Sequence, residues 1–479
     1  MIFKVPLNRI VEGDYMNFIN IDRHSKISLS KQLYIYYKDS ILKGNLKSND
    51  KLPSTRELSR NLNIARNVVL DCYEQLMAEG YIYTKSGSGS YICEGINFQQ
   101  IKIKRKSQFN KSDKNVEKIS FRTGIPDLDS IPISKWVQIY KETILNIKVS
   151  QMDYQNSFGS YELRFELSNY LERVRGVYTS PDNILITNGA AQAFSLLCQL
   201  IKPHEYVLVE NPLSYGILHT LESNQVTIKP IEVDEHGMVT SQLPKQPPKF
   251  IFTTPSHQFP TGVVLPINRR IEMIKYAQKY DTYIVEDDYD SEFRFDGDPI
   301  QSMQGLDPEN VIYLGTFSKT LIPALRIGYM VLPDKLLNEI EDIKYVADIH
   351  SPNFEQIALA KFMETGLFDR HISKMRRLYL KKRNYLVKCL KKEFGEDVKI
   401  SGDQAGMHFV ATFKNVTFNK TLMSNISKKN IEITPMTKHY IGDSSDFKID
   451  NALIFGYGNT KTEQMKKGIR LLADIIRVK

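Results

Sequence analysis

Lys319 stands among residues whose types and spacing suit covalent chemistry with an aldehyde. It follows Asp287 by 32 positions and precedes Arg326 by seven. A lysine amine can form a Schiff base with a carbonyl compound, and a carboxylate can keep a pyridine nitrogen protonated so that the ring draws electrons from a bound amine. A guanidinium binds a phosphate group through paired hydrogen bonds. These three side chains predict a site for pyridoxal 5′-phosphate (PLP).

The sequence predicts further hydrogen-bond donors for a phosphate group near this lysine. Residues 187–192 follow a predicted strand and begin a predicted helix, a turn where glycine allows close backbone approach and free N–H groups point at an anion. Two hydroxyl side chains precede the lysine. Each residue alone is explained more simply by a structural role, but their gathering around Lys319 favours cofactor binding. The candidates are Gly189, Ala190, Ala191, Thr316, Ser318 and Arg326.

The acidic run 285–290 admits two interpretations. Asp287 follows an apolar strand and can pair with the pyridine nitrogen, while Tyr289 can contact the ring hydroxyl. The same run could instead hold a metal ion or form a solvated turn. No second group of ligands accompanies it, so we predict no metal site.

The elements that position these residues alternate along the chain from residue 121 onward. Short β-branched runs alternate with helical patterns, which predicts an α/β fold with a largely parallel sheet flanked by helices. In open sheets of this kind a ligand lies beyond the carboxyl ends of the strands, where the candidate residues fall. The predicted strands are 183–187, 206–210, 250–254, 283–286 and 311–315.

The first hundred residues predict a different domain. Helical patterns cover residues 28–42, 54–62 and 66–79, and the last of these ends at Gly80. Ser54 and Glu57 have the spacing of a capping box that opens the second helix. The second and third helices are predicted to form a helix-turn-helix. The inward residues of the third helix are predicted to be Val69, Tyr73, Leu76 and Met77.

Residues 81–93 predict a β-hairpin with a glycine-rich tip, which would complete a winged helix. The N-terminal end of a recognition helix usually meets base edges, and a small flexible tip can reach phosphates or a minor groove. The alternative is a small helical domain that serves dimerisation. The candidate DNA-binding residues are Ser54, Thr55, Arg56, Arg66, Asn67, Lys85, Ser88 and Gly89.

The positive charge of the chain is concentrated near its N-terminus. Residues 1–118 carry 20 Lys and Arg against 12 Asp and Glu, which is +8 of the net +9. Such asymmetry favours an anionic partner, usually nucleic acid. Within this part, residues 95–118 are poor in apolar side chains and rich in lysine, so we predict a charged linker between domains 1–94 and 119–479.

Length and composition exclude several classes of protein. The 479 residues exceed one ordinary core, and 42% apolar with 25% charged residues is typical of a globular protein. No long apolar run and no signal peptide are found, so we expect a cytoplasmic protein without a membrane segment. The four cysteines, Cys72, Cys93, Cys198 and Cys389, are widely spaced and indicate neither zinc nor disulfides.

Four segments resemble the gntR-type winged helix: residues 51–58, 65–68, 76–81 and 88–92. The resemblance implies binding to double-stranded DNA. Ala65 departs from the pattern of that family, which usually has serine or threonine at this place to cap the recognition helix.

From about residue 120 to 478 the chain is similar to the fold-type I PLP enzymes of the aminotransferase class I and II group. Residues 254–262, 286–293 and 315–319 carry the similarity, and 405–409 support it. With the winged helix, this is the architecture of MocR-type transcriptional regulators. The resemblance implies Lys319 as Schiff-base lysine, Asp287 and Tyr289 as ring contacts, a small C-terminal subdomain and a head-to-tail, domain-swapped homodimer.

Several positions depart from the pattern of an active aminotransferase. Phe259 replaces an asparagine that contacts the ring hydroxyl, and Asn459 is aligned with the arginine that binds a substrate carboxylate. Ser214 replaces the ring-stacking aromatic residue, for which Tyr215 is the predicted substitute. Gly216 stands where GABA-responsive members carry an arginine. Loss of a guanidinium clamp should weaken amino-acid binding.

We therefore expect a PLP-dependent transcriptional regulator without efficient catalysis, which binds repeated operator half-sites and senses PLP or a small amine. Vitamin B6 synthesis genes are the expected target, as for the pyridoxine-biosynthesis members of the family. The alternatives are a GABA- or amino-acid-responsive regulator, an active aminotransferase with an accessory DNA-binding domain, and a DNA-binding protein whose second domain only dimerises.

Overall fold

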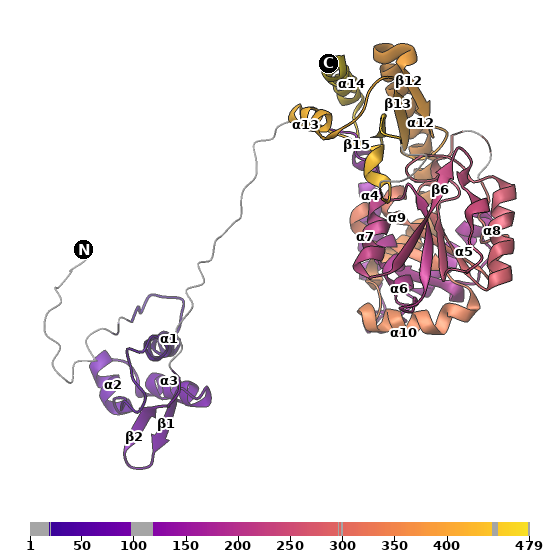
Figure 1. Ribbon diagram of the computed structural model, residues 1–479. Helices are drawn as coiled ribbons and strands as arrows, with labels where there is room; N and C mark the ends of the chain where they lie inside the picture. Colours follow the sequence, from indigo (N-terminus) through magenta and orange to yellow (C-terminus); the bar gives the residue numbers. More distant parts are fainter. Residues whose placement is uncertain are drawn as a thin grey trace. The chain divides into compact units, whose positions relative to one another are not determined.

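The computed structural model describes residues 19, 21–96, 118–295, 297, 300–442 and 449–477. The chain divides into two compact units, Met1–Asp113 and Lys114–Lys479, whose elements are labelled in Figure 1. Each unit is described separately below. Residues 97–117, which make up nearly all of the predicted linker, lie outside the described residues. Within the described part of the chain, no helix is long and apolar enough to span a bilayer.

The described residues of the first unit form three helices and one hairpin, as predicted. The two strands pair antiparallel around a tip at residues 86–88, with Lys85 opposite Gly89. The elements are α1 Leu29–Leu42, α2 Thr55–Leu62, α3 Arg66–Ala78, β1 Ile82–Lys85 and β2 Gly89–Ile92.

Local capping sets the limits of the second and third helices. Ser54 Oγ accepts from the N–H of Glu57 at 3.2 Å, and the Glu57 carboxylate accepts from the N–H of Ser54 at 3.4 Å, which confirms the predicted capping box. Asn63 adopts a left-handed conformation, with φ 50°, and ends α2. Ala65 begins α3 with no side-chain cap.

A single apolar core holds this unit together, and it corrects one prediction. Val69, Tyr73 and Leu76 are buried in it, at spacings that place them on one face of α3. Met77 is 39% exposed. It lies at the edge of the apolar face, and the fourth inward position belongs to Cys72, which is fully buried.

The second unit is built on an eight-stranded sheet with the order β4-β11-β10-β9-β8-β5-β6-β7. The central pairs from β10 through β6 are parallel, whereas β11 and β7 run antiparallel to their neighbours. All five predicted strands are confirmed. The strands are β4 Ile184–Thr187, β5 Tyr206–Asn211, β6 Thr227–Asp234, β7 Gly237–Met238, β8 Phe250–Thr253, β9 Tyr283–Asp288, β10 Val311–Thr316 and β11 Gly328–Val331.

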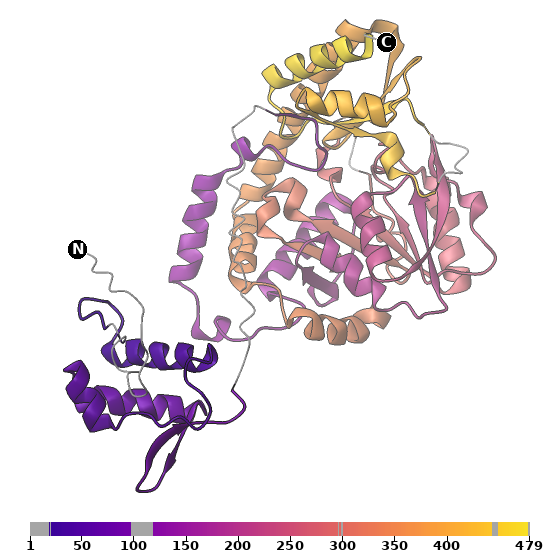
Figure 2. The ribbon, with the colours of Figure 1, turned by 60° about the vertical axis from the view of Figure 1, so that its left-hand side comes forward.

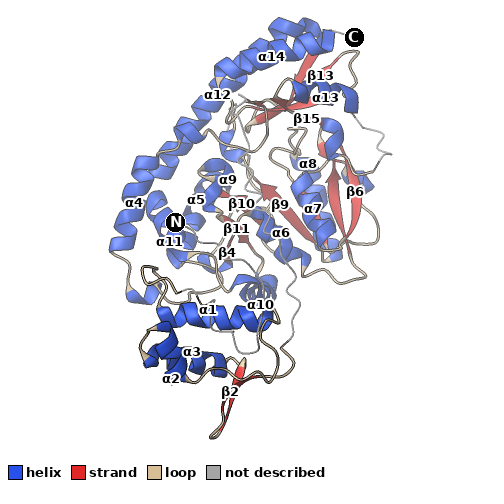
Figure 3. Cartoon of the chain, turned by 90° about the vertical axis from the view of Figure 1, so that its left-hand side faces the viewer, coloured by secondary structure: helices blue, strands red, loops and turns tan. Residues whose placement is uncertain are grey.

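Helices cover both faces of this sheet (Figure 3). The alternation of side chains along a strand supplies both apolar layers: Leu185 packs into one core, while its neighbours Ile184 and Ile186 pack into another. The helices are α4 Ile133–Leu145, α5 Tyr161–Arg175, α6 Ala190–Cys198, α7 Tyr215–Ser223, α8 Ile267–Tyr280, α9 Phe317–Thr320, α10 Leu337–Asp348 and α11 Asn353–Glu364.

A C-terminal subdomain with its own sheet and core completes the second unit (Figure 2). Its sheet has the order β12-β13-β16-β15, and the first strand of the unit, β3, pairs in parallel with β14. Ile119 and Phe121 are therefore part of the subdomain core. The elements are β3 Ile119–Ser120, α12 Leu367–Phe394, β12 Val398–Ser401, β13 His408–Phe413, α13 Lys420–Lys428, β14 Ile431–Glu432, β15 Thr434–Pro435, β16 Ala452–Gly456 and α14 Thr462–Arg477.

Candidate functional site

A cavity of about 320 Å³ lies beyond the carboxyl ends of the parallel strands. Asp287 reaches it from β9, Thr316 from β10 and Thr254 from the end of β8. Gly124 and His408 close it from the segment after β3 and from the C-terminal subdomain. The location matches the rule for ligand sites in open α/β sheets.

Lys319 projects into this cavity from the short helix α9, directly after β10. Its Nζ donates a hydrogen bond to the carbonyl oxygen of Gly124 at 2.7 Å. Burial lowers the pKa of the amine, against the opposing charges of Asp290 and Asp287. A lowered pKa increases the neutral, nucleophilic fraction of a lysine amine, which suits attack on a carbonyl carbon.

Asp287 lines the same cavity at the end of β9. Burial and the neighbouring Asp288 carboxylate raise its pKa to about 7, while the charge of Lys319 acts in the opposite direction. Part of its side chain faces the cavity. A carboxylate in such surroundings is stabilised by a cationic ligand, and a protonated pyridine nitrogen would supply that charge.

The corner around Gly189 has the properties of a phosphate site. Gly189 has φ 81°, and a side chain there would lie only 2.5 Å from the Arg326 guanidinium, so a residue without Cβ keeps this space open. Arg326 donates to the carbonyl oxygen of Asn188 at 2.9 Å. Helix α6 begins here without a side-chain cap, and Ala190 and Ala191 both line the cavity.

Ser318 supplies the clearest sign of a missing partner. Its Oγ is buried and has no hydrogen-bond partner among the described residues, although Ser318 lines the cavity. A buried hydroxyl is rarely left unpaired in a protein. Thr316 instead accepts from the N–H of Ser318 at 3.2 Å and so positions it. These residues fit the phosphate of the expected cofactor.

A partly buried network that the sequence did not reveal supports this corner from behind. Asp348 Oδ2 accepts from the side chains of Asn188 at 2.7 Å and Gln192 at 2.8 Å. Lys344 is fully buried and forms an ion pair with Asp348. The network fixes the turn before α6.

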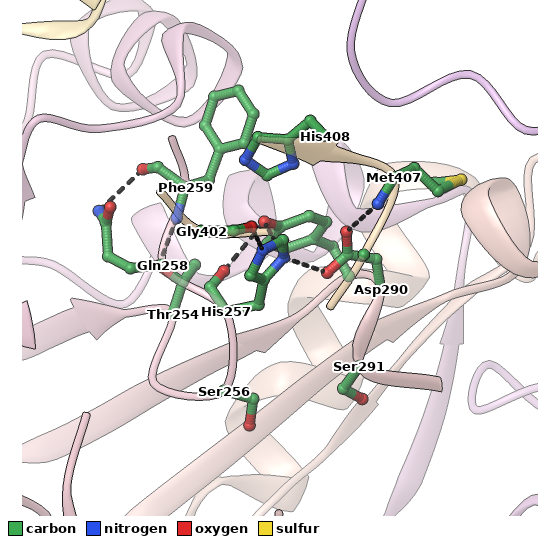
Figure 4. A network of polar contacts seen from close by, with 12 residues as sticks. Thr254, Ser256, His257, Gln258, Phe259, Asp290, Ser291, Gly402, Met407 and His408 are labelled. Atoms are coloured by element: carbon green, nitrogen blue, oxygen red, sulfur yellow. Dashed lines mark hydrogen bonds and ion pairs between the residues drawn. The ribbon is translucent and has the colours of Figure 1, made fainter. Parts of the chain in front are cut away.

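Tyr289 is held by a second network, drawn in Figure 4 around His257 and Asp290. Its hydroxyl donates to the His257 carbonyl oxygen at 2.9 Å and lies 3.1 Å from His257 Nδ1. His257 Nδ1 lies 2.9 Å from Asp290 Oδ1, with both side chains buried. Burial lowers the pKa of His257, but the charge of Asp290 and their hydrogen bond outweigh it, so the pKa is raised. The phenol therefore has a fixed position at the cavity wall.

The rings of Phe259 and His408 lie beside this network (Figure 4). The Phe259 ring lies 5.1 Å from that of His408 and 5.2 Å from that of His439. Burial and the charge of His257 lower the pKa of His408 well below its usual range. Potential ligand atoms of His257, Asp290 and His408 lie within 4.8 Å of one another. Both histidines already have protein partners, Asp290 and the Pro260 carbonyl, so the cluster is explained without an ion, and the absence of a metal site stays a prediction.

Two predicted residues lie outside the cavity. Tyr215 is 63% exposed, and its ring stacks on His219 at 5.8 Å, so it does not substitute for a ring-stacking residue. Asn459 is exposed, and its Oδ1 accepts from the N–H of Leu128 at 3.4 Å. The alignment of Asn459 with a carboxylate-binding position is therefore wrong. Phe259 and Gly216 do line the cavity.

The predicted DNA-binding residues lie on the surface of the first unit. Arg66 and Asn67 are exposed at the start of α3, and Arg66 Nε donates to Thr55 Oγ1 at 3.3 Å. Arg56 is also exposed. Ser54, in contrast, uses its hydroxyl in the capping box, so its main role is to begin α2.

The hairpin tip combines cations with aromatic rings. Lys85 Nζ lies 5.1 Å from the ring centre of Tyr91, and Ser88 Oγ shares a 2.6 Å hydrogen bond with the Tyr91 hydroxyl. Gly89 has φ 121°, and a side chain there would meet the Lys51 side chain at 3.0 Å. The tip is thus small, positively charged and braced at its base.

Comparison with known proteins agrees with this division of the chain. Residues 116–454 match the model of the family "Aminotransferase class I and II", and residues 29–92 match "Bacterial regulatory proteins, gntR family". The uncharacterized HTH-type transcriptional regulator YdeL of Bacillus subtilis is 34% identical over 96% of this chain and 98% of its own.

Two further similarities bear on the cavity. The HTH-type pyridoxine biosynthesis transcriptional regulator PdxR of Corynebacterium glutamicum is 27% identical over 96% of this chain and 98% of its own. Among solved structures, the kynurenine aminotransferase of Pyrococcus horikoshii has a TM-score of 0.69 at 27% identity, covering 75% of this chain and 91% of that one.

Proposed function

The chain belongs to the aminotransferase class I and II family and joins that domain to a gntR-family DNA-binding domain, the architecture of MocR-type transcriptional regulators, and we propose that it controls transcription in response to PLP bound at Lys319. We assign residues 1–94 to the winged helix, 95–118 to the linker and 119–479 to the cofactor-binding domain.

One observation carries the cofactor assignment: Lys319, Asp287 and the unpartnered Ser318 hydroxyl line one cavity. When bound, PLP would supply an aldehyde for covalent attachment and a ring that withdraws electrons. Lys319 offers an amine of lowered pKa, and Asp287 a carboxylate for the ring nitrogen. Ser318, Arg326 and the start of α6 are assigned to the phosphate.

The cavity supports sensing better than catalysis. Among the described residues that line it, Arg326 is the one arginine, and it lies at Gly189 in the phosphate corner. This leaves no second guanidinium for the α-carboxylate of an amino acid. An active aminotransferase with an accessory DNA-binding domain is the second candidate, favoured by the similarity to kynurenine aminotransferase.

We infer that PLP itself is the signal and that genes of vitamin B6 synthesis are the target. The similarity to the pyridoxine biosynthesis regulator PdxR supports this assignment. Gly216, which lines the cavity without a charge, supports it over a GABA-type effector. The assembly proposed is a head-to-tail homodimer whose two winged helices bind repeated half-sites, because a dimer on DNA requires paired sites at fixed spacing.

The coupling between cofactor and DNA is assigned to the contact of Lys319 with Gly124. Lys118 is the last residue of the predicted linker, and Gly124 lies six residues after it. A lysine nitrogen bonded to a ligand carbon keeps at most one N–H group to donate, so ligand binding should weaken or redirect the hydrogen bond to the Gly124 carbonyl. Coupling further requires that the two DNA-binding arrangements differ in affinity for the ligand.

A titration of DNA from the chain's own upstream region, with and without PLP, tests the proposal. The expected result is a sequence-specific complex whose affinity changes with PLP in the wild type and not in Lys319→Ala. Steady conversion of any amino acid and keto acid pair at about one turnover per second or faster, typical of enzymes, would overturn the regulatory assignment in favour of catalysis.

A further inference from the structure

Helix α12 carries an unusual concentration of positive charge. Between Arg370 and Lys392 it contains ten Lys and Arg and no Asp or Glu. Beyond residue 118 the chain has 44 Lys and Arg against 43 Asp and Glu, so without these ten cations that part of the chain would be nine charges negative. The near-neutral total of the second unit therefore conceals one strongly basic element.

Six of these cations form a stripe along the outward face of the helix. They follow one another at intervals of three, four or seven residues, which places them on one side of an α-helix. All six are exposed, whereas Met375, Tyr379 and Leu386 are buried on the opposite side. The stripe consists of Arg370, Lys374, Arg377, Lys381, Lys388 and Lys392.

Among the described residues, none forms an ion pair with a cation of this stripe. In the described part of the chain, the ion pairs of α12 use Asp369, Lys382, Arg383 and Glu393, none of which belongs to the stripe. Stripe members contact main-chain carbonyls instead, as Lys374 does with Ser130 at 3.4 Å. Like charges one turn apart repel one another, so the stripe offers the fold no electrostatic gain.

Helix α14 extends the basic surface. It packs beside α12 (Figure 3), and the hollow between them is lined by Lys388 and Lys392 from α12 and by Lys466 and Arg470 from α14. Glu393 offsets part of this charge, because it lies 3.9 Å from Arg470 and 3.9 Å from Arg477. The exposed cations of α12 thus continue into Lys466 and Arg470 of α14 at this end of the helix.

The dimensions of the stripe fit duplex DNA. At 1.5 Å per residue, the distance from Arg370 to Lys392 is roughly 33 Å along the helix. With a rise of 3.4 Å per base pair, this equals about ten base pairs of B-DNA. The flexible side chains of lysine and arginine suit contacts with a phosphate backbone, because such contacts depend on charge and do not read the base sequence.

The exposed face of α12 is poorly suited to a lipid surface. Helices that lie in a membrane interface present large apolar side chains beside their cations. Among the described residues, none of the exposed large hydrophobic side chains lies on α12 or α14. An anionic membrane is therefore the less favoured occupant.

We propose that this stripe is a second DNA-binding surface, which contacts the phosphate backbone of duplex DNA flanking the site held by the winged helices. The inference rests on the proposed function, since it assumes that the first unit brings DNA to the protein. It assigns to the aminotransferase-like domain a direct part in DNA binding, in addition to the binding of PLP in its cavity.

The test compares full-length wild type with the triple variant Arg377→Glu, Lys381→Glu, Lys388→Glu. Binding is measured against salt on two duplexes of upstream DNA, one of about 20 base pairs, which holds two half-sites, and one several turns longer. On the longer duplex we expect at least about tenfold weaker binding and a salt slope smaller by about 2 to 3, because each phosphate contact contributes about 0.9. On the short duplex the variant should match the wild type.

Two further proteins make the result decisive. The control Lys245→Glu, Lys275→Glu, Lys279→Glu changes the net charge equally at exposed positions elsewhere and should bind both duplexes as the wild type does. The milder set Arg377→Gln, Lys381→Gln, Lys388→Gln is used in case the charge reversals unfold the helix, and its melting is checked by circular dichroism. It should weaken binding to the longer duplex in the same direction.

Equal salt slopes for wild type and stripe variant on the longer duplex would overturn the inference while leaving the proposed function intact. The variant Arg66→Ala tests the proposed function separately. If this variant still prefers upstream over scrambled DNA as strongly as the wild type does, the proposed function fails. If the stripe variant loses binding to phosphatidylserine–phosphatidylcholine vesicles but not to DNA, the surface belongs to a membrane and the assignment to DNA is wrong.

Discussion

The Nζ of Lys319 donates a hydrogen bond of 2.7 Å to the carbonyl oxygen of Gly124, a residue 195 positions earlier in the chain. Lys319 lies in the short helix α9, directly after strand β10 of the eight-stranded sheet, whereas the segment before Gly124 belongs to the core of the C-terminal subdomain. The bond therefore joins two bodies of the second unit at the point where the cofactor is expected. Substitutions at Lys319, Ser318 and Gly189 test whether this cavity binds PLP.

Substitution Lys319→Ala should abolish covalent attachment of PLP. The visible absorbance of the protein-bound cofactor should disappear after dialysis, because no other lysine among the described residues lines the cavity. DNA binding without PLP should persist, since the first unit is unaltered. The exposed Lys335→Ala serves as control and should retain the absorbance. Retention of the band in Lys319→Ala would disprove the assignment.

Substitution Ser318→Ala should weaken phosphate binding without affecting the fold. A hydrogen bond to a charged group contributes about 1.5 to 3 kcal/mol, so we expect PLP affinity to fall by about tenfold or more, measured by equilibrium titration. Pyridoxal, which lacks the phosphate, should bind wild type and variant equally well. A similar loss for pyridoxal would show that Ser318 does not contact the phosphate.

Substitution Gly189→Ala should reduce PLP affinity more severely. The new methyl group would lie 2.5 Å from the Arg326 guanidinium, at a backbone φ of 81° that side chains rarely adopt. Gly395→Ala is the matched control, because Gly395 also has a positive φ, of 54°, but a methyl group there meets nothing within 4 Å. Equal affinity in the two variants would contradict a phosphate site at this turn.

The ion pair of His257 and Asp290 should make stability depend on pH. Since the folded-state pKa of His257 is raised above 6.5, its contribution is fully present below about pH 6.5 and is lost as the pH rises through the folded value. Melting temperatures of wild type should fall over this range relative to those of His257→Gln. His204→Gln, at an exposed position, should follow the wild-type profile. Parallel profiles for wild type and His257→Gln would rule out a charged pair.

Substitution Ala65→Ser should stabilise the winged helix. Ala65 precedes α3 in an extended conformation, with φ −62° and ψ 139°, and provides no cap. A serine hydroxyl can accept from the first free N–H groups of the helix, with a gain of about 1 kcal/mol. Chemical denaturation of the full chain, followed by a probe in the first unit, measures the gain. Ala78→Ser, at the last residue of α3, should give none.

The sequence predicted the sheet and most of the cavity, because both depend on local rules. β-branched runs identify the strands, and residues that follow parallel strands meet at one edge, which brings Asp287, Thr316 and Ser318 together. Capping and turn residues likewise predicted the helices of the first unit.

The errors and omissions have physical reasons. Gly124 was missed because its role depends on a main-chain carbonyl, which leaves no side-chain pattern, and on a contact between distant segments. The pair of His257 and Asp290 is also a tertiary contact. Asn459 was placed wrongly because it follows β16 in a loop, where no periodicity fixes the alignment with other chains. The prediction that Met77 faces inward was wrong because helical spacing alone does not set the width of an apolar face.

The pairing of β3 with β14 has a mechanical consequence. Ile119 and Ser120 are tied to the C-terminal subdomain, and Gly124 touches Lys319 only a few residues later. The segment from Ile119 to Gly124 thus connects the two parts of the second unit, because its first residues pair with β14 of the C-terminal subdomain and its last accepts a hydrogen bond from Lys319 beside the eight-stranded sheet. A rotation of the C-terminal subdomain relative to the eight-stranded sheet would carry Lys118 with it, because Lys118 forms an ion pair with Glu432 of β14, and no helix would have to move in between.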